Sequence, residues 1–199
     1  MKKSVLLLIL GSFLSVGAFS QITIQSVSCE NLTNPIGLDI TQPRFSWVLA
    51  SPGRNVSQSA YEIHVSKDPS SLGKGDVWNS GRIQSDQSVF IPYGGPALSS
   101  GEKYFWQVKV WDNSGKASAW SAPAFWQMGL LNPSDWKAKW IQVTYKEDET
   151  GQPSPLFRKE FKVSKKIKSA TAYVTSLGLY EASLNGKRIG DAYLTPGWT

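Results

Sequence analysis

The stretch YFWQVKVWD, from Tyr104 to Asp112, decides the fold class of this chain. Large apolar side chains stand at every second position of the stretch, beginning with Tyr104 and Trp106 and continuing through two valines. Successive side chains of a strand point to opposite faces of a sheet, so this period of two predicts a β-strand with one face in a core. The turn-forming run that follows, Asn113 to Gly115, marks the end of that strand.

The same alternation recurs in two runs upstream, and no segment shows a sustained apolar period of 3.6 residues. Each run puts three large apolar residues on one face: Phe45, Trp47 and Leu49 in the first, and Tyr61, Ile63 and Val65 in the second. Clusters of Pro, Gly, Asn and Ser separate the runs, as in antiparallel sandwiches. We therefore predict an all-β protein in which residues 21–131 form a fibronectin type III-like β-sandwich, a fold of about 100 residues.

One tyrosine in this region stands where a fibronectin type III domain places its corner tyrosine. Tyr104 opens the longest run and comes six residues after Leu98, and Trp120 follows where the last strand would begin. In that arrangement the phenol hydroxyl forms a hydrogen bond with the chain a few residues upstream. We expect this bond near Leu98.

The segment NPSD, from Asn132 to Asp135, is the expected boundary to a second module, because a proline ends the preceding strand. Within residues 132–199, Asn185-Gly186 is the strongest hairpin signal. Strands are expected at 157–163, at 170–174, at 179–184 and from Arg188 onward. A sandwich needs about seven strands to cover both faces of a core, and only about four are available here. We therefore expect residues 132–199 to be the truncated start of a jelly-roll-like β-sandwich.

Met1–Ser20 has the pattern of a secretory signal peptide. Lys2 and Lys3 give a positive start, Val5–Leu10 is an unbroken apolar run, and Ala18-Phe19-Ser20 offers small residues for cleavage. The apolar run is far shorter than the roughly 20 residues that a membrane-spanning helix needs. The sequence therefore predicts a periplasmic or secreted protein with a cleaved signal peptide and no membrane span.

Candidate catalytic and metal-binding side chains are few. Cys29 is the only cysteine and His64 the only histidine, which leaves almost no material for a zinc site or a Cys/His nucleophile. We expect Cys29 to be buried on a strand and His64 to face away from the core. The acidic run Glu147–Glu149 lies in a Pro- and Gly-flanked loop, typical of a solvated turn. We predict no catalytic residue in this chain.

The charge distribution does not indicate a nucleic-acid partner. The formal net charge is +6, but residues 21–131 carry eight basic and eight acidic side chains, so the basic excess of the mature chain lies in residues 132–199. Lysines there are interleaved with Phe161, Val163 and Ile167, a pattern typical of the solvent face of a strand. Export would also separate the protein from nucleic acid, and we therefore predict no such partner.

A series of short motifs runs along the whole mature chain. The motifs are Asn34–Asp39, Pro43–Trp47, Val77–Gly81, Tyr104–Asp112, Trp136–Ile141, Gly178–Glu181, Asn185-Gly186, Gly190-Asp191 and Pro196–Thr199. Several of them would be weak alone, but in this order and at this spacing they resemble the N-terminal region of bacterial α-L-rhamnosidases.

The resemblance implies a fibronectin-like module followed by a jelly-roll-like module. In the family these precede further β-structure, an (α/α)6 catalytic barrel and a C-terminal β-domain, against which they would pack. The family's catalytic carboxylates belong to the barrel, so no position here receives them. The implied function is that of an N-terminal accessory fragment of an inverting glycoside hydrolase that removes terminal α-L-rhamnose from glycans, with the fragment itself inactive.

Sugar binding in the second module is a further expectation. Sugars dock on aromatic faces flanked by amides and carboxylates, and such residues gather around the predicted hairpin. The candidate substrate-binding residues are Tyr180, Asn185, Asp191, Tyr193 and Trp198. Related modules of the rhamnosidase family bind rhamnose, in some cases with calcium, and otherwise no cofactor is expected. The alternative for these aromatic residues is that they only pack in a core or between domains. The alternatives for the whole chain are a stand-alone secreted carbohydrate-binding or adhesion protein, and a structural spacer without a ligand.

Overall fold

The computed structural model describes residues 22–144, 150–151 and 154–197. They divide into two units, with the division after Trp140. The predicted signal peptide, residues 1–20, and the predicted solvated turn at Glu147–Glu149 lie outside the described residues, so both stay predictions. The predicted limits of the two modules, at residues 131 and 132, also stay predictions. Within the described residues, no helix has the length and apolarity required to cross a bilayer.

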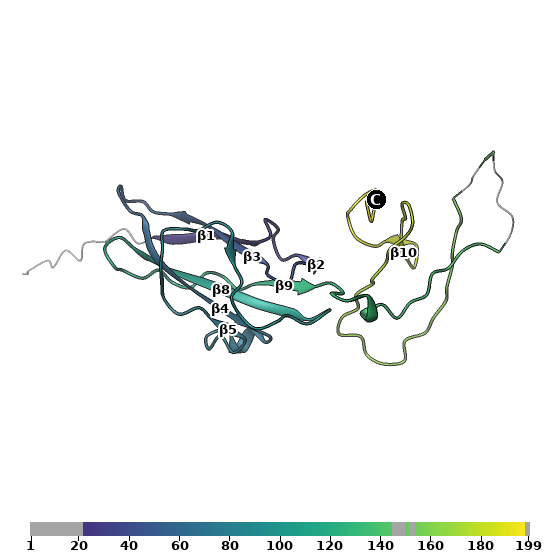
Figure 1. Ribbon diagram of the computed structural model, residues 1–199, viewed down its shortest axis with the longest axis horizontal. Coiled ribbons are helices and arrows are strands. Elements are labelled where there is room, and N and C mark those ends of the chain that lie inside the picture. Colours follow the sequence, from purple (N-terminus) through teal and green to yellow (C-terminus); the bar gives the residue numbers. More distant parts are fainter. Residues whose placement is uncertain (1–21, 145–149, 152–153, 198–199) are drawn as a thin grey trace, which may run out of the picture. The chain divides into compact units, whose positions relative to one another are not determined.

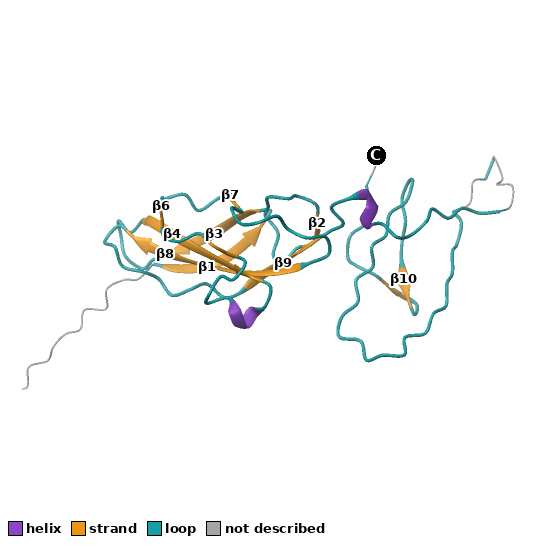
Figure 2. Cartoon of the chain, turned by 60° about the horizontal axis from the view of Figure 1, so that its bottom comes forward, coloured by secondary structure: helices purple, strands orange, loops and turns teal. Residues whose placement is uncertain are grey.

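The first unit consists of two β-sheets, which Figures 1 and 2 show lying over one another. The smaller sheet has the order β1-β3-β7, formed by Thr23–Cys29, Arg44–Ala50 and Ile91–Pro92. The larger sheet has the order β2-β9-β8-β4-β5, formed by Ile36–Leu38, Ala124–Met128, Lys103–Asp112, Gln58–Ser66 and Trp78–Asn79, and β6 (Ile83–Gln84) also pairs with β4. All pairings are antiparallel except that of β2 with β9, which is parallel.

The inner faces of the two sheets meet in an aromatic core. Phe45 of β3 lies 4.4 Å from the ring of Trp106 and 5.3 Å from that of Trp126, measured between ring centroids. Tyr104 stacks on Trp126 at 5.2 Å. The alternation that predicted β8 is confirmed, because its four inward side chains are all buried, and Cys29 is buried as expected. The predicted all-β fold class is thereby confirmed.

The expected corner tyrosine is also confirmed. The backbone N–H of Ser99 donates a hydrogen bond of 3.0 Å to the phenol oxygen of Tyr104, which ties the loop before β8 to the core. The phenol is the acceptor in this bond.

Tyr104→Phe should therefore destabilise the sandwich. The substitution keeps the ring against Trp126 but leaves the Ser99 N–H without its acceptor, which should cost on the order of 1 kcal/mol. Denaturant unfolding followed by circular dichroism measures this cost. Tyr173→Phe, at a half-exposed tyrosine of the second unit, is the control and should leave the unfolding curve unchanged. Equal midpoints for the wild type and Tyr104→Phe would contradict the assignment.

Cys29 should be chemically silent in the folded protein. Its side chain is 1% exposed, and burial, with a smaller contribution from the charge of Glu30, raises its pKa to about 12. Because only the thiolate is a nucleophile, a disulfide reagent at pH 8 should label the thiol only after denaturant is added. Stoichiometric labelling of the native protein would show that β1 does not seal this position.

His64 points away from the aromatic core, as expected, but it does not face solvent. It is 5% exposed, because the 3-10 turn η1 (Pro69–Ser71) with the residues after it and the ring of Trp120 cover it. The expectation that His64 faces outward did not include this cover, because the ring of Trp120 comes from a segment far along the chain.

The second unit has little regular structure. Its hairpin is confirmed: β10 (Ser183–Leu184) pairs with β11 (Lys187–Arg188), and Asn185 and Gly186 take the positive φ angles of 51° and 75° that a tight turn requires. The strands predicted at 157–163 and 170–174 are wrong, since neither segment pairs with another strand.

The reason for that failure is the lack of a pairing partner. A strand is stable only beside another strand, and among the described residues the one ladder of this unit is the hairpin. The apolar side chains of these unpaired segments therefore remain exposed. Leu156 is 95% exposed and Phe161 is 67% exposed. The sheet of the second unit is open.

The remaining short helix, η2 (Pro133–Asp135), lies in the first unit, where Asp135 accepts a hydrogen bond from the Asn132 N–H at 3.0 Å.

Candidate functional site

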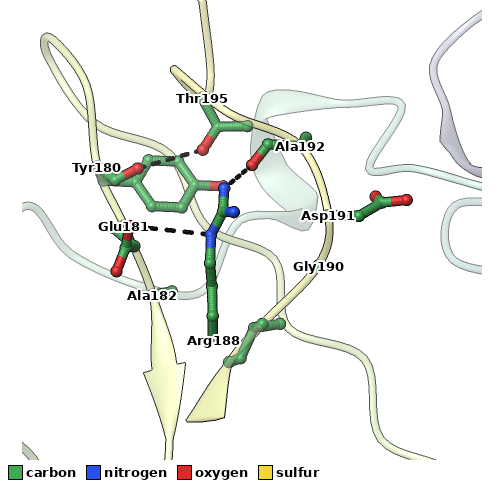
Figure 3. A pocket seen from close by; sticks show the side chains of 9 residues that line it. Tyr180, Glu181, Ala182, Arg188, Gly190, Asp191, Ala192 and Thr195 are labelled. Atoms are coloured by element: carbon green, nitrogen blue, oxygen red, sulfur yellow. Dashed lines mark hydrogen bonds and ion pairs between the residues drawn. The ribbon is translucent and has the colours of Figure 1, made fainter.

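A hollow of about 200 Å³ lies beside the hairpin of the second unit (Figure 3). Residues 180–182 form one wall, residues 188–192 form another, and Thr195 closes the end. All of these residues come from the hairpin and the turn that follows it, so a continuous segment of 16 residues builds the site. The residues that line the hollow are therefore close together in the sequence.

Backbone hydrogen bonds hold the two walls together. The N–H of Tyr180 donates to the carbonyl of Thr195 at 2.8 Å, and the Thr195 hydroxyl donates to the carbonyl of Tyr180 at 3.3 Å. The N–H of Ile189 donates to the carbonyl of Ala182 at 2.8 Å and continues the hairpin by one step. These bonds fix the backbone around the opening and leave the side chains to give it chemical character.

Arg188 supplies most of the polar character of the hollow. Its guanidinium lies 3.9 Å from the ring centroid of Tyr193 and donates a hydrogen bond to the carbonyl of Ala192. Its Nε atom is 3.9 Å from a carboxylate oxygen of Glu181 across the hairpin. The guanidinium has five N–H donors, so donors remain for a polar ligand after these contacts.

The structure brings only part of the predicted set together. Tyr180 and Asp191 line the hollow. Tyr193 is 79% exposed and covers the guanidinium of Arg188 rather than lining the opening. Asn185 forms the hairpin turn and lies outside the lining, and Trp198 lies outside the described residues.

Sequence reasoning missed Arg188 and Glu181. A signal for them was present, because an acidic and a basic residue stand nearly opposite each other on the two sides of the Asn185-Gly186 turn. Cross-strand positions of this kind bring opposite charges within reach.

The hollow does not assemble a metal centre from acidic side chains. Figure 3 shows the carboxylate of Asp191 directed away from the Arg188 guanidinium, whereas Glu181 faces it. Across the part of the chain that the structure describes, no group of three or more His, Cys, Asp or Glu side chains lies together. Calcium binding by this module stays a prediction.

Comparison with known proteins decides the family. Residues 24–132 match the family described as Rha78A-like, N-terminal immunoglobulin domain, which is more than half of the chain. Residues 165–199 match the alpha-L-rhamnosidase N-terminal domain. The chain belongs to the Rha78A-like family of α-L-rhamnosidase N-terminal regions. The resemblance inferred from the motifs is thereby confirmed, and the parallel β2–β9 pair belongs to this immunoglobulin-like domain.

Similar rhamnosidases come from several bacteria. An α-L-rhamnosidase of Formosa agariphila is 39% identical over 82% of this chain, and one of Streptomyces avermitilis is 35% identical over 90%. The chain spans about a fifth of the length of these curated relatives, 20% of each. Among solved structures, the α-L-rhamnosidase from Dictyoglumus thermophilum has a TM-score of 0.77 and 36% identity, covering 88% of this chain and 21% of that one. The Streptomyces avermitilis enzyme complexed with L-rhamnose has a TM-score of 0.61 and 46% identity, covering 62% and 12%.

Proposed function

We propose that this chain is an N-terminal accessory region of a glycosidase that hydrolyses terminal α-L-rhamnose from glycans. The observation that carries the proposal is the match itself: relatives named α-L-rhamnosidase align with most of this chain and with about a fifth of their own length. The catalytic groups would then belong to the rest of such a protein. Export by the segment at residues 1–20 is part of the same proposal, because a rhamnosidase acting on external glycans must meet them outside the cytoplasm.

The chemistry of the described residues supports an accessory role. Inverting glycosidases need two carboxyl groups roughly 6.5–9.5 Å apart across a cleft. At the hollow, one of the two carboxylates is paired with Arg188 and the other is directed away from it. The hollow of about 200 Å³ is also smaller than a typical ligand pocket of roughly 300–1,000 Å³. Such a site is suited to holding one sugar ring rather than to cleaving a glycosidic bond.

A hydrolysis assay tests the accessory role. The chain, incubated with an aryl α-L-rhamnoside, should release no more chromophore than buffer does, while a full-length relative assayed in parallel releases it. Release that rises in proportion to the concentration of the chain and persists after repurification would overturn the proposal.

A second candidate function is sugar binding in the hollow. Tyr180 offers a ring at its wall, Arg188 offers N–H donors, and Asp191 offers acceptor oxygens. These are the groups that a sugar such as rhamnose requires, because its C–H face packs on rings and its hydroxyls need partners. The structure of a relative in complex with L-rhamnose makes rhamnose the first ligand to try.

Isothermal titration of the chain with rhamnose, with and without calcium, tests the binding candidate. Heat of binding should appear for the wild type and disappear for Arg188→Met and Asp191→Asn. Arg158→Met is the matched control, because Arg158 is an exposed arginine of the same unit that pairs with Glu160 away from the hairpin. No heat from the wild type in either condition would remove the candidate.

A further inference from the structure

His64 has a hydrogen-bond acceptor at both ring nitrogens. On one side, Nδ1 lies 3.0 Å from the backbone carbonyl oxygen of Leu72, in the loop of residues 69–76. On the other side, Nε2 lies 2.8 Å from a carboxylate oxygen of Glu62, two residues earlier in β4. The ring is 5% exposed, so water does not substitute for either partner.

The two contacts of the ring are both hydrogen bonds in only one protonation state of the ring. A neutral imidazole has one donor nitrogen and one acceptor nitrogen, whereas a carbonyl oxygen and an ionised carboxylate can only accept. Burial raises the pKa of the Glu62 carboxyl, but hydrogen bonds from His64 and Lys109 outweigh that effect and leave this pKa below its ordinary value. Glu62 is therefore the ionised acceptor, and both contacts are satisfied only when each ring nitrogen carries a hydrogen.

The charged groups around the ring agree with this assignment. From β8, the ammonium of Lys109 lies 3.1 Å from the second carboxylate oxygen of Glu62 and 4.5 Å from the ring of Trp120. Trp120 in turn packs on the imidazole at 4.3 Å between ring centroids. In the covering loop, the carboxylate of Asp76 accepts a hydrogen bond of 2.9 Å from the hydroxyl of Ser71. Glu62 is thus the acid that directly faces His64.

We propose that His64 is a proton-dependent clasp that holds the loop of residues 69–76 on strand β4. When the ring loses one proton, the remaining hydrogen stays on Nε2, because a bond to a carboxylate is stronger than a bond to a neutral carbonyl. The bare Nδ1 then faces the Leu72 oxygen, and two lone pairs at hydrogen-bond distance repel. The clasp is closed when both ring nitrogens carry a hydrogen and opens when Nδ1 loses its hydrogen.

The variant Glu62→Gln distinguishes the proton-dependent clasp from packing of the loop that does not depend on the protons of His64. A glutamine at position 62 can turn its amide N–H toward a neutral Nε2, and Nδ1–H then keeps its bond to the Leu72 carbonyl. The variant should therefore hold the loop at any protonation state of the ring. Glu102→Gln is the control, because it removes a carboxylate from an exposed ion pair with Lys67, outside the His64 contacts.

Hydrogen exchange of the loop amides, with rates corrected for the intrinsic effect of pH, is the test. The N–H groups of Lys74 and Gly75, which donate to the carbonyls of Ser71 and Leu72, report on the loop. Between pH 5 and pH 9 their protection should fall roughly tenfold in the wild type and in Glu102→Gln, the effect of losing one hydrogen bond to a charged group. It should stay constant in Glu62→Gln.

A second readout does not depend on any variant. Because the chain contains a single histidine, the ring ¹⁵N signals belong to His64 without further assignment. Two protonated nitrogens in the state with the protected loop would support the clasp. A neutral ring with a bare Nδ1 and unchanged loop protection would overturn it, and so would equal pH dependence in the wild type and Glu62→Gln.

Discussion

Trp106→Ala should lower the free energy of unfolding of the first unit by about 3–5 kcal/mol, the range for removing a fully buried large aromatic side chain. Trp106 is 0% exposed, lies on the central strand β8 and contacts Phe45 of the opposite sheet at 4.4 Å. Alanine would leave a cavity between the sheets that rigid neighbours cannot fill. Because stabilities of small domains are about 5–15 kcal/mol, this loss is a large part of the total.

Chemical denaturation followed by far-ultraviolet circular dichroism measures this loss without depending on the tryptophan signal. Trp140→Ala is the matched control, since Trp140 belongs to the same unit and is 69% exposed. Its effect should stay within about 0.5 kcal/mol. Similar costs for the two alanine variants would mean that the core does not lie between the two sheets as described.

Gly75→Ala should destabilise the sandwich by about 2 kcal/mol, through backbone strain and overpacking together. Gly75 has a φ angle of +59°, which residues with a side chain rarely adopt. An added Cβ would also lie 2.8 Å from the carbonyl oxygen of Trp78 and 3.2 Å from Cγ of His64. The backbone oxygen cannot move away without breaking the edge of the sheet at β5.

Gly73→Ala, two residues earlier in the same loop, is the control. A Cβ at that position meets no atom within 4 Å and the φ angle is not in the left-handed region. The variant should be neutral or slightly stabilising, by about 0.5 kcal/mol, because alanine reduces the entropy of the unfolded chain. If the two glycine variants had the same midpoint of unfolding, the close packing of the loop on His64 would be contradicted.

The sequence predicted the strands of the sandwich well where apolar and polar residues alternate. The runs around Phe45, Tyr61 and Trp106 became strands with the expected faces inward, and Tyr104 accepted the expected hydrogen bond. It did not predict that Ile36–Leu38 pairs in parallel with β9, because three residues carry no period and the partner is about 90 residues away. The cover over His64 was missed for the same reason, since Trp120 reaches it from another part of the chain.

In the second unit, local signals succeeded and non-local ones failed. The Asn185-Gly186 turn formed because its geometry depends only on its own residues. The alternation at 157–163 did not become a strand, because alternation fixes which face is apolar and does not supply a neighbouring strand. At the candidate site, Tyr180 and Asp191 were found from the sequence, whereas Arg188 was missed because its role depends on the ring of Tyr193 lying over it.

The central claim is that this chain serves as the N-terminal accessory region of an α-L-rhamnosidase. The most direct test replaces the matching N-terminal fifth of the Streptomyces avermitilis enzyme with this chain and measures hydrolysis of an aryl α-L-rhamnoside. We predict that the folded chimera hydrolyses the substrate at a rate within about tenfold of the parent, a change of about 1.4 kcal/mol in the barrier. A chimera that folds but releases no rhamnose would contradict the account.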